Sequence, residues 1–162
     1  MNDSGYYRFG WGTQLNGLLL AGVGVSQAVV EGLLLSHVTG RFGERHTAII
    51  GYVAGAFGYA VLATAIAGWA VAPAIVLIGL GGLATPSVRA MVSGRGEADN
   101  QGQMQGVLSA VEGLTAIVAP LLTAGLFFAF TSHSLPVTFP GAPFALTAAA
   151  AVLALVLLRK LD

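Results

Sequence analysis

The stretch from residue 47 to residue 88 contains no Asp, Glu, Lys or Arg. A single helix of that length would measure about 63 Å, roughly twice the ~30 Å hydrocarbon core of a bilayer, so it must fold back once. Residues 113 to 158 form a second stretch without these charges. Together the two stretches predict a chain that crosses a membrane several times.

The overall composition favours the same class of protein. Hydrophobic residues make up 56% of the chain and charged residues 9%, against roughly 25% charged residues in soluble domains. The formal net charge is zero and there is no Cys, so we expect no nucleic-acid partner, no disulfide and no thiolate metal site. The first residues lack a basic segment followed by a short apolar one, so we expect no cleavable signal peptide.

Gly and Pro residues mark the places where the uncharged stretches fold back. Gly68 and Pro73 lie in the first, and Pro136, Pro140 and Pro143 lie in the second, a composition typical of helix breaks and first helical turns. The sequence therefore predicts an all-α polytopic membrane bundle of five transmembrane helices. The expected spans are about residues 14–37, 47–67, 71–92, 102–130 and 142–159.

The basic residues occur in alternate connecting segments. Cytoplasmic loops carry an excess of Lys and Arg, so we expect the loops with Arg41 and Arg45 and with Arg89 and Arg95, and the C-terminus, on the cytoplasmic side of the plasma (inner) membrane. The N-terminus and the two Arg-free loops are then outside. Both Trp residues, Trp11 and Trp69, fall at this outer surface, where aromatic side chains are enriched.

Small residues and prolines recur within the expected spans. Gly51 and Gly55 stand four residues apart, a spacing that lets membrane helices approach closely but is common in any Gly-rich bundle. Pro86 and Pro120 each remove a backbone hydrogen bond, which favours a kink. Such bends suit gating or static packing equally.

Two carboxyl groups lie inside the expected spans, Glu31 and Glu112. A charged side chain at a helix centre costs roughly 2.5–3.5 kcal/mol on insertion scales, so such groups usually face a bundle interior or a wet cavity. A buried carboxyl that gains and loses a proton suits a proton-coupled transporter. A structural carboxyl bonded to Gln27, Thr115 or a neighbouring helix is the alternative. For Arg89 we favour an interpretation in which the side chain reaches the lipid headgroups.

Other polar residues in the spans either face a passage or make hydrogen bonds between helices, and the second role is the commoner one. They are Gln14, Asn16, Gln27, Thr85, Ser87, Ser109 and Thr115.

The first charged loop reads Gly40-Arg41-Phe42-Gly43-Glu44-Arg45-His46. Its glycines allow a tight turn, and its mixed charges can cap helix ends. The loop resembles the second-half copy of the loop motif of the major facilitator superfamily. The segments 8–11, 68–69, 101–106 and 117–122 resemble the tetracycline-efflux branch of that family in the same order, so the resemblance covers nearly the whole chain.

The resemblance implies helices eight to twelve of a twelve-helix, proton-driven exporter of small amphiphilic compounds, without a cofactor. In such a carrier the substrate passes between two halves that rock against each other. The expected partners are therefore the lipid bilayer, a small-molecule substrate, protons and the missing N-terminal half. The alternative is a non-transporting remnant or a membrane scaffold that associates with another protein.

The chain also departs from the pattern of the family. The resemblance implies an intramembrane His and Asp at the positions occupied by Gln27 and Gly55, neither of which titrates. We hypothesise that Glu31 and Glu112 take over proton coupling or cation binding, with Gln27 in the same cavity. An enzyme is not expected, because His37, His46 and His133 are scattered along the chain and no nucleophile or metal constellation is evident.

Overall fold

The computed structural model describes residues 13–65, 68–95, 101–131 and 139–160, and this part of the chain is helical without strands. The all-α fold class is thereby confirmed. The elements are α2 (Thr13–Val29), η1 (Val30–Leu34, a π-helix), α3 (Leu35–Thr64), η2 (Gly68–Ala70), α4 (Val71–Gly81), α5 (Ala84–Arg95), α6 (Gln101–Thr131) and α7 (Ala142–Lys160).

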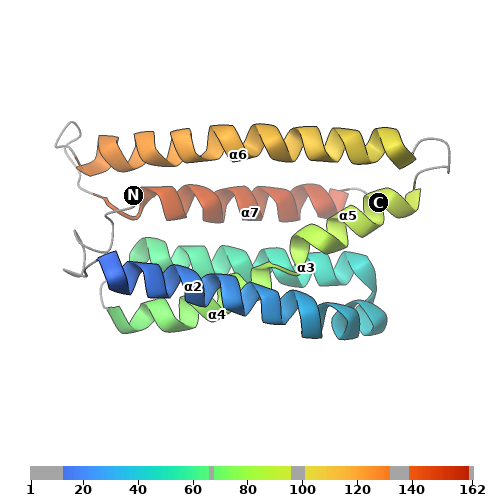
Figure 1. The fold of residues 1–162 in the computed structure, drawn as a ribbon, viewed down its shortest axis with the longest axis horizontal. Helices are drawn as coiled ribbons and strands as arrows, with labels where there is room; N and C mark the ends of the chain where they lie inside the picture. Colours follow the sequence, from blue (N-terminus) through green and yellow to red (C-terminus); the bar gives the residue numbers. More distant parts are fainter. Residues whose placement is uncertain (1–12, 66–67, 96–100, 132–138, 161–162) are drawn as a thin grey trace.

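Within the described residues, four helical segments are long and apolar enough to cross a membrane. The first of them, Gly17–Thr64, has 48 residues, about twice the length that a bilayer requires. It turns back on itself within α3, and the later segments also alternate in direction, as Figure 1 shows. Five antiparallel passes result, which agrees with a polytopic membrane bundle.

The turn within α3 is centred on Gly43. Its backbone angles are φ 78° and ψ 164°, a region that only glycine adopts readily. The hydroxyl of Thr47 donates a hydrogen bond of 2.8 Å to the carbonyl of Gly43. This bond satisfies a backbone acceptor beside the turn, and the helix resumes there with Thr47 fully buried.

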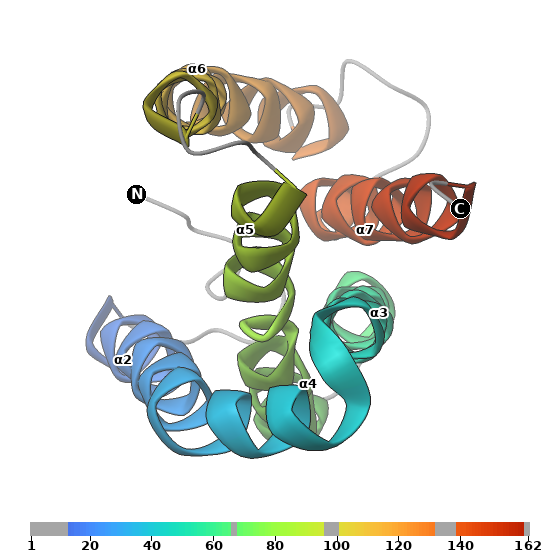
Figure 2. The same cartoon turned by 90° about the vertical axis from the view of Figure 1, so that its right-hand side faces the viewer.

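Helix α3 is the element on which the bundle is built. It packs against α4, α5 and α7, while α2 packs against α4. Figure 2 shows α5 at the centre of the molecule, with α6 above it and α2 below it to the left, apart from each other. Helix α6 packs against α5 and α7.

Glycines bring α3 close to α4 and α5. A Cβ atom added to Gly51 would lie 2.6 Å from the backbone nitrogen of Ala84, and one added to Gly58 would lie 2.9 Å from that of Ile78. Between them, Gly55 faces Gly81. The small residues at four-residue spacing thus form a real contact between helices, as they do in many membrane proteins.

The third predicted span is interrupted between α4 and α5. Helix α4 ends at Gly81 and α5 begins at Ala84, so Pro86 lies in the first turn of α5. A proline clashes with the carbonyl four positions earlier, which here belongs to Gly82 at the interruption. In contrast, α6 continues through Pro120.

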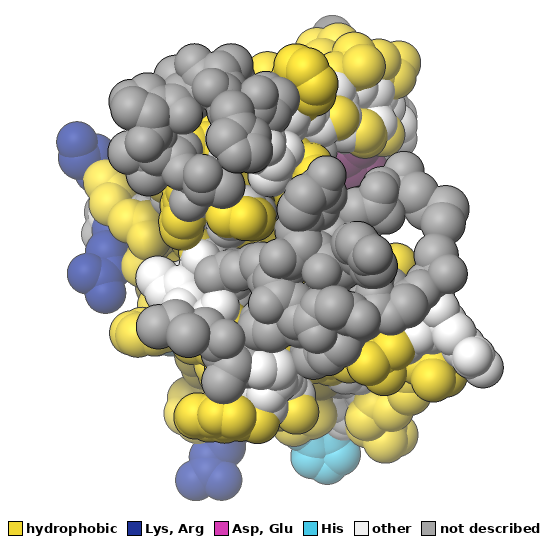
Figure 3. All heavy atoms as spheres, turned by 90° about the vertical axis from the view of Figure 1, so that its left-hand side faces the viewer, with side chains coloured by type: hydrophobic (Ala, Val, Ile, Leu, Met, Phe, Trp, Pro, Cys, Tyr) yellow, Lys and Arg dark blue, Asp and Glu magenta, His cyan; other side chains and the backbone are white. Residues whose placement is uncertain are grey.

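Much of the molecule exposes apolar side chains. No residue of α6 is buried, and Leu114, Ile117 and Leu121 are each more than 60% exposed. Figure 3 shows mostly hydrophobic side chains among the described residues at the end of the molecule where α2 begins. The predicted N-terminal aromatic residues, including Trp11, and the acidic residues Glu97 and Asp99 lie outside the described residues.

Candidate functional site

The carboxyl group of Glu31 lies on the one π-helical turn in the described part of the chain. This turn, η1, carries a wide hydrogen bond in which the backbone N–H of Leu35 donates to the carbonyl of Val30. Isolated π turns within longer helices are frequent at functional sites. Here the turn sets the direction in which Glu31 leaves the helix.

Gln27 and Glu31 lie one helical turn apart and approach the interruption between α4 and α5. A Cβ atom added to Gly82 would lie 3.3 Å from Oε1 of Glu31 and 3.5 Å from Cγ of Gln27. The missing side chain at Gly82 therefore makes room for both. The structure brings these two predicted site residues together.

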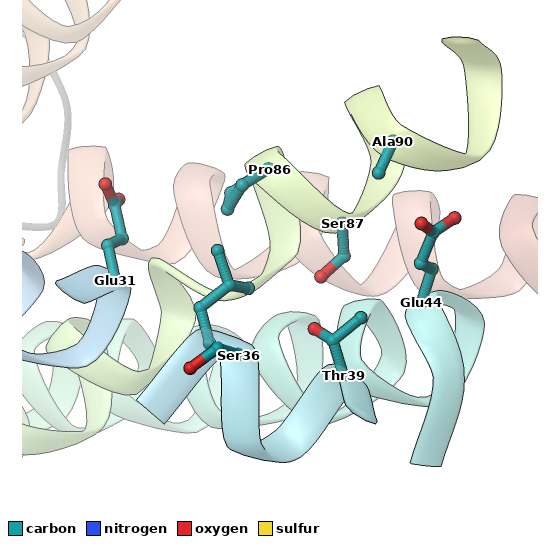
Figure 4. Close-up of a pocket in the computed structure, with 8 residues that line it drawn as sticks. Glu31, Ser36, Thr39, Glu44, Pro86, Ser87 and Ala90 are labelled. Carbon is teal, nitrogen blue, oxygen red and sulfur yellow. The ribbon is translucent and has the colours of Figure 1, made fainter. Parts of the chain in front are cut away.

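A pocket of about 250 Å³ opens next to Glu31, between the η1–α3 segment and α5. Its walls are formed by Glu31, Leu35, Ser36, Thr39, Glu44, Pro86, Ser87 and Ala90. Figure 4 shows Glu31 and Glu44 at opposite ends of this pocket, with Ser36, Thr39 and Ser87 between them. We call it the acidic pocket.

Two hydroxyl groups in the acidic pocket have no hydrogen-bond partner. They are Oγ of Ser87 and Oγ1 of Thr39, both shielded from solvent, and Ser87 is only 2% exposed. In Figure 4 the two hydroxyls point toward each other from facing helices. Buried polar groups are normally paired, so these two are available to a polar group that enters the pocket.

The second predicted carboxyl, Glu112, forms an ion pair with Arg89. The Nε atom of Arg89 donates to Oε1 of Glu112 at 2.8 Å, and the terminal nitrogen of the same guanidinium donates to Oε2. This two-point geometry is the strong form of an Arg–carboxylate contact. The sequence suggested that the side chain of Arg89 reaches the lipid headgroups. In the structure this side chain instead joins α5 to α6 through its ion pair with Glu112.

Helix α5 lies between the two carboxyl sites. Ser87 lines the acidic pocket and Arg89 pairs with Glu112, and residues two apart on a helix point to different faces. A further bond of 2.9 Å, from the amide of Gln105 to Ser93, joins α5 and α6 closer to their connection. The structure does not bring Glu31 and Glu112 together. Glu31 borders the pocket that Ser87 of α5 lines, and Glu112 pairs with Arg89 on another face of α5.

The residues of the charged loop take separate roles. Arg45 donates a hydrogen bond of 3.4 Å to the backbone carbonyl of Leu158 in α7, at a helix end where cations are favourable. The guanidinium of Arg41 lies 5.8 Å from the ring centre of Phe42, and Gly40 is exposed. Glu44, just after the turn, reaches the acidic pocket.

Comparison with known protein families gives a match over residues 6–162, almost the entire chain, to the Major Facilitator Superfamily. The chain belongs to the major facilitator superfamily. The acidic pocket and the Arg89–Glu112 ion pair thus occur in a chain of the major facilitator superfamily.

The chain is also similar to tetracycline resistance proteins. It is 38% identical to the class C protein of Escherichia coli over 77% of this chain and 32% of that relative. It is 32% identical to the class B protein of Escherichia coli over 80% of this chain and 31% of that relative. The class G protein of Vibrio anguillarum is 35% identical over 75% of this chain and 31% of its own length.

The chain therefore spans about a third of the length of these relatives. No solved structure matches it. The similarity to tetracycline resistance proteins agrees with the resemblance seen in the sequence, and membership in the major facilitator superfamily agrees with its apolar, multi-pass helices.

Sequence reasoning did not foresee the roles of two residues in these sites. Glu44 was expected as part of the charged-loop motif, and its place in the acidic pocket depends on the turn at Gly43. Arg89 looked like a headgroup anchor, although a carboxyl on the next predicted span was available as its partner. Opposite charges within consecutive spans were the signal that could have found this pair.

Proposed function

We propose that this chain is part of a proton-coupled transporter that exports a small, amphiphilic, tetracycline-type compound across the plasma membrane. The Arg89–Glu112 ion pair is the observation that carries the proposal, because it joins a carboxylate and its counter-ion on two helices that belong to candidate membrane spans. The family and the tetracycline resistance relatives support the same function. Transport, rather than catalysis, is the activity proposed.

The ion pair offers a simple route for coupling a proton to helix movement. An unpaired carboxylate in an apolar environment favours its protonated form, and a paired one favours the charged form. In this proposal Arg89 is the counter-ion of Glu112 while α5 and α6 are together. Separation of the two helices breaks the pair and leaves Glu112 as the group that binds the transported proton, which is released when the pair forms again.

Transport in this proposal also requires the N-terminal half of the carrier. Residues 1–162 form one unit that corresponds to helices eight to twelve. The N-terminal half provides the opposite wall of the substrate passage. The exposed apolar surface of α6 is compatible with such a partner, since every residue from Val111 to Leu122 is exposed. Without that half the chain is a non-transporting remnant or a scaffold.

Charge substitutions in the complete transporter test the coupling role. We expect Glu112→Gln to abolish proton-driven transport of tetracycline in proteoliposomes while exchange of tetracycline without a proton gradient continues. Glu31→Gln is expected to have the same effect. The matched control is the double variant Arg89→Gln with Glu112→Gln, which leaves no unpaired charge between α5 and α6.

The double variant separates a coupling role from a structural one. If Glu112 carries the proton, the double variant accumulates in the membrane at the normal level and still lacks proton-driven transport. If the pair only holds the helices together, the neutral double variant transports normally, and the proposal is wrong.

The need for the N-terminal half is tested by resistance profiling. Cells that make this chain alone are expected to show no tetracycline resistance, and cells that also make a seven-span N-terminal partner are expected to gain it. Resistance from the chain alone would contradict the proposal of an incomplete carrier.

A further inference from the structure

We propose that the acidic pocket binds a small organic ammonium ion between the hydroxyls of Ser87 and Thr39, while the acidic side chains of Glu31 and Glu44, at the two ends of the pocket, supply the charge that favours a cation. This inference goes beyond the proposed function, because it concerns equilibrium binding inside the five-helix unit and needs neither a proton gradient nor the opposite half of a carrier.

The charges of the pocket favour a cation. Two of the residues that line it are acidic and none is basic. Neither Glu31 nor Glu44 has an ion-pair partner in the described part of the chain, whereas Arg89 is engaged by Glu112 and Arg45 bonds the carbonyl of Leu158. Two carboxylates without a resident counter-ion, one at each end of the pocket, favour a positive charge between them.

The hydroxyl of Ser87 is a second and independent sign of a ligand. It is part of a residue that is 2% exposed, it has no partner, and it is directed into the space between α3 and α5 (Figure 4). A buried hydroxyl without a partner is unfavourable. An ammonium N–H donates to this oxygen and to Oγ1 of Thr39, and thereby satisfies both groups.

The size and the walls of the pocket indicate an organic cation rather than a bare metal ion. A volume of about 250 Å³ far exceeds the roughly 10–15 Å³ that holds one water. Leu35, Pro86 and Ala90 supply apolar surface beside the carboxylates. Within the described residues no three His, Asp or Glu side chains converge as metal ligands do. A hydrocarbon group carrying one ammonium matches both kinds of wall.

Binding of cyclohexylammonium to the polypeptide in lipid nanodiscs tests this inference. We measure binding by isothermal titration calorimetry, subtract the signal of empty nanodiscs, and compare cyclohexanol as the neutral analogue and sodium as the inorganic cation. We expect saturable binding of cyclohexylammonium, at least tenfold weaker binding of cyclohexanol, and no competition from sodium at equal concentration.

Variants locate the site. Glu31→Gln is expected to weaken binding at least tenfold, and Ser87→Ala several-fold. Ala90→Leu, which fills the pocket without changing its charge, is expected to abolish binding. The matched control is Thr64→Ala, which removes a hydroxyl that bonds its own helix at the carbonyl of Ala60 and lies outside the pocket. Thermal melting of each variant verifies folding.

Each outcome bears on the proposal. Equal affinity for cyclohexanol, effective competition by sodium, or unchanged binding in both Glu31→Gln and Ala90→Leu overturns it. Loss of proton-driven tetracycline transport leaves it standing, since binding is measured without a gradient. Conversely, absent ammonium binding does not alter the coupling role proposed for Glu112, so the two failures are distinguishable.

Discussion

Single glycines decide how closely α3 can approach its neighbouring helices. At Gly51 an added Cβ would meet the backbone of Ala84 at 2.6 Å, whereas at Gly55 the nearest atom, the Cα of Gly81, would be 3.5 Å away. The first distance requires backbone movement, and the second is an ordinary van der Waals contact. Two glycines on one buried face of α3 are therefore not equivalent.

Gly51→Ala is expected to destabilise the bundle by about 1–3 kcal/mol, the usual effect of overpacking a tightly packed core. Gly55→Ala, the matched control four residues away, is expected to leave stability nearly unchanged. Thermal unfolding in detergent, followed by circular dichroism, measures the difference. A lower melting temperature for Gly55→Ala than for Gly51→Ala would show that this interface does not hold α3 as described.

Residue identity in the sequence was enough to find the intramembrane carboxyls but not their partners. Arg89 and Glu112 are separated by 23 residues and lie on different helices, so their pairing depends on how α5 packs against α6. Ser87 stood among several polar residues of the spans, and nothing in the sequence distinguished it from the others. Thr115, in the same group, simply bonds its own helix at the carbonyl of Val111.

At the scale of elements, α3 shows how one residue divides a helix into two passes. Gly43 alone among the described glycines has a positive φ, and the chain reverses there. Gly40, three residues earlier, has open space around it and no such angle. Of the two glycines in the charged loop, Gly43 therefore needs the conformational freedom of glycine and Gly40 does not. The sequence motif does not reveal this difference.

Gly43→Ala is expected to lower stability by about 1–3 kcal/mol, because a side chain is strained in this backbone region. Gly40→Ala is expected to be tolerated. The folded fraction of each variant, measured by size-exclusion chromatography after mild heating, provides the comparison. Equal behaviour of the two variants would mean that the turn does not need the conformation of Gly43.

Helices and their apolar lengths are local properties, and for that reason the all-α membrane class could be predicted from the sequence. The interruptions are only partly local. Pro86 correctly marked a break, but the helix is interrupted four residues earlier, around Gly82. In a continuous helix the ring of Pro86 would clash with the carbonyl group of Gly82. Pro120 lies within a continuous α6. The π turn at Glu31 had no clear signal in the sequence.

At the scale of the whole molecule, the basic segments gather at one end of the bundle. The turn within α3, the end of α5 and the end of α7 lie at the same end, and the segment before α4 lies at the opposite end (Figure 1). This arrangement fits the orientation proposed from the charges, in which the basic end faces the cytoplasm. Basic residues that occur in alternate connecting segments of the sequence therefore lie together at one end of the bundle.

The absence of Cys from the chain permits a direct measurement of that orientation. In intact cells, a membrane-impermeant maleimide is expected to label Trp69→Cys, since Trp69 is 78% exposed in the segment expected outside. Lys160→Cys, at the exposed end of α7, is expected to react only after the cells are permeabilised. If the expressed transporter includes residues beyond 1–162, any cysteine among them is replaced by serine beforehand. The opposite labelling pattern would reverse the orientation and place the acidic pocket near the outer surface, because Thr39 and Glu44 flank the turn at the basic end.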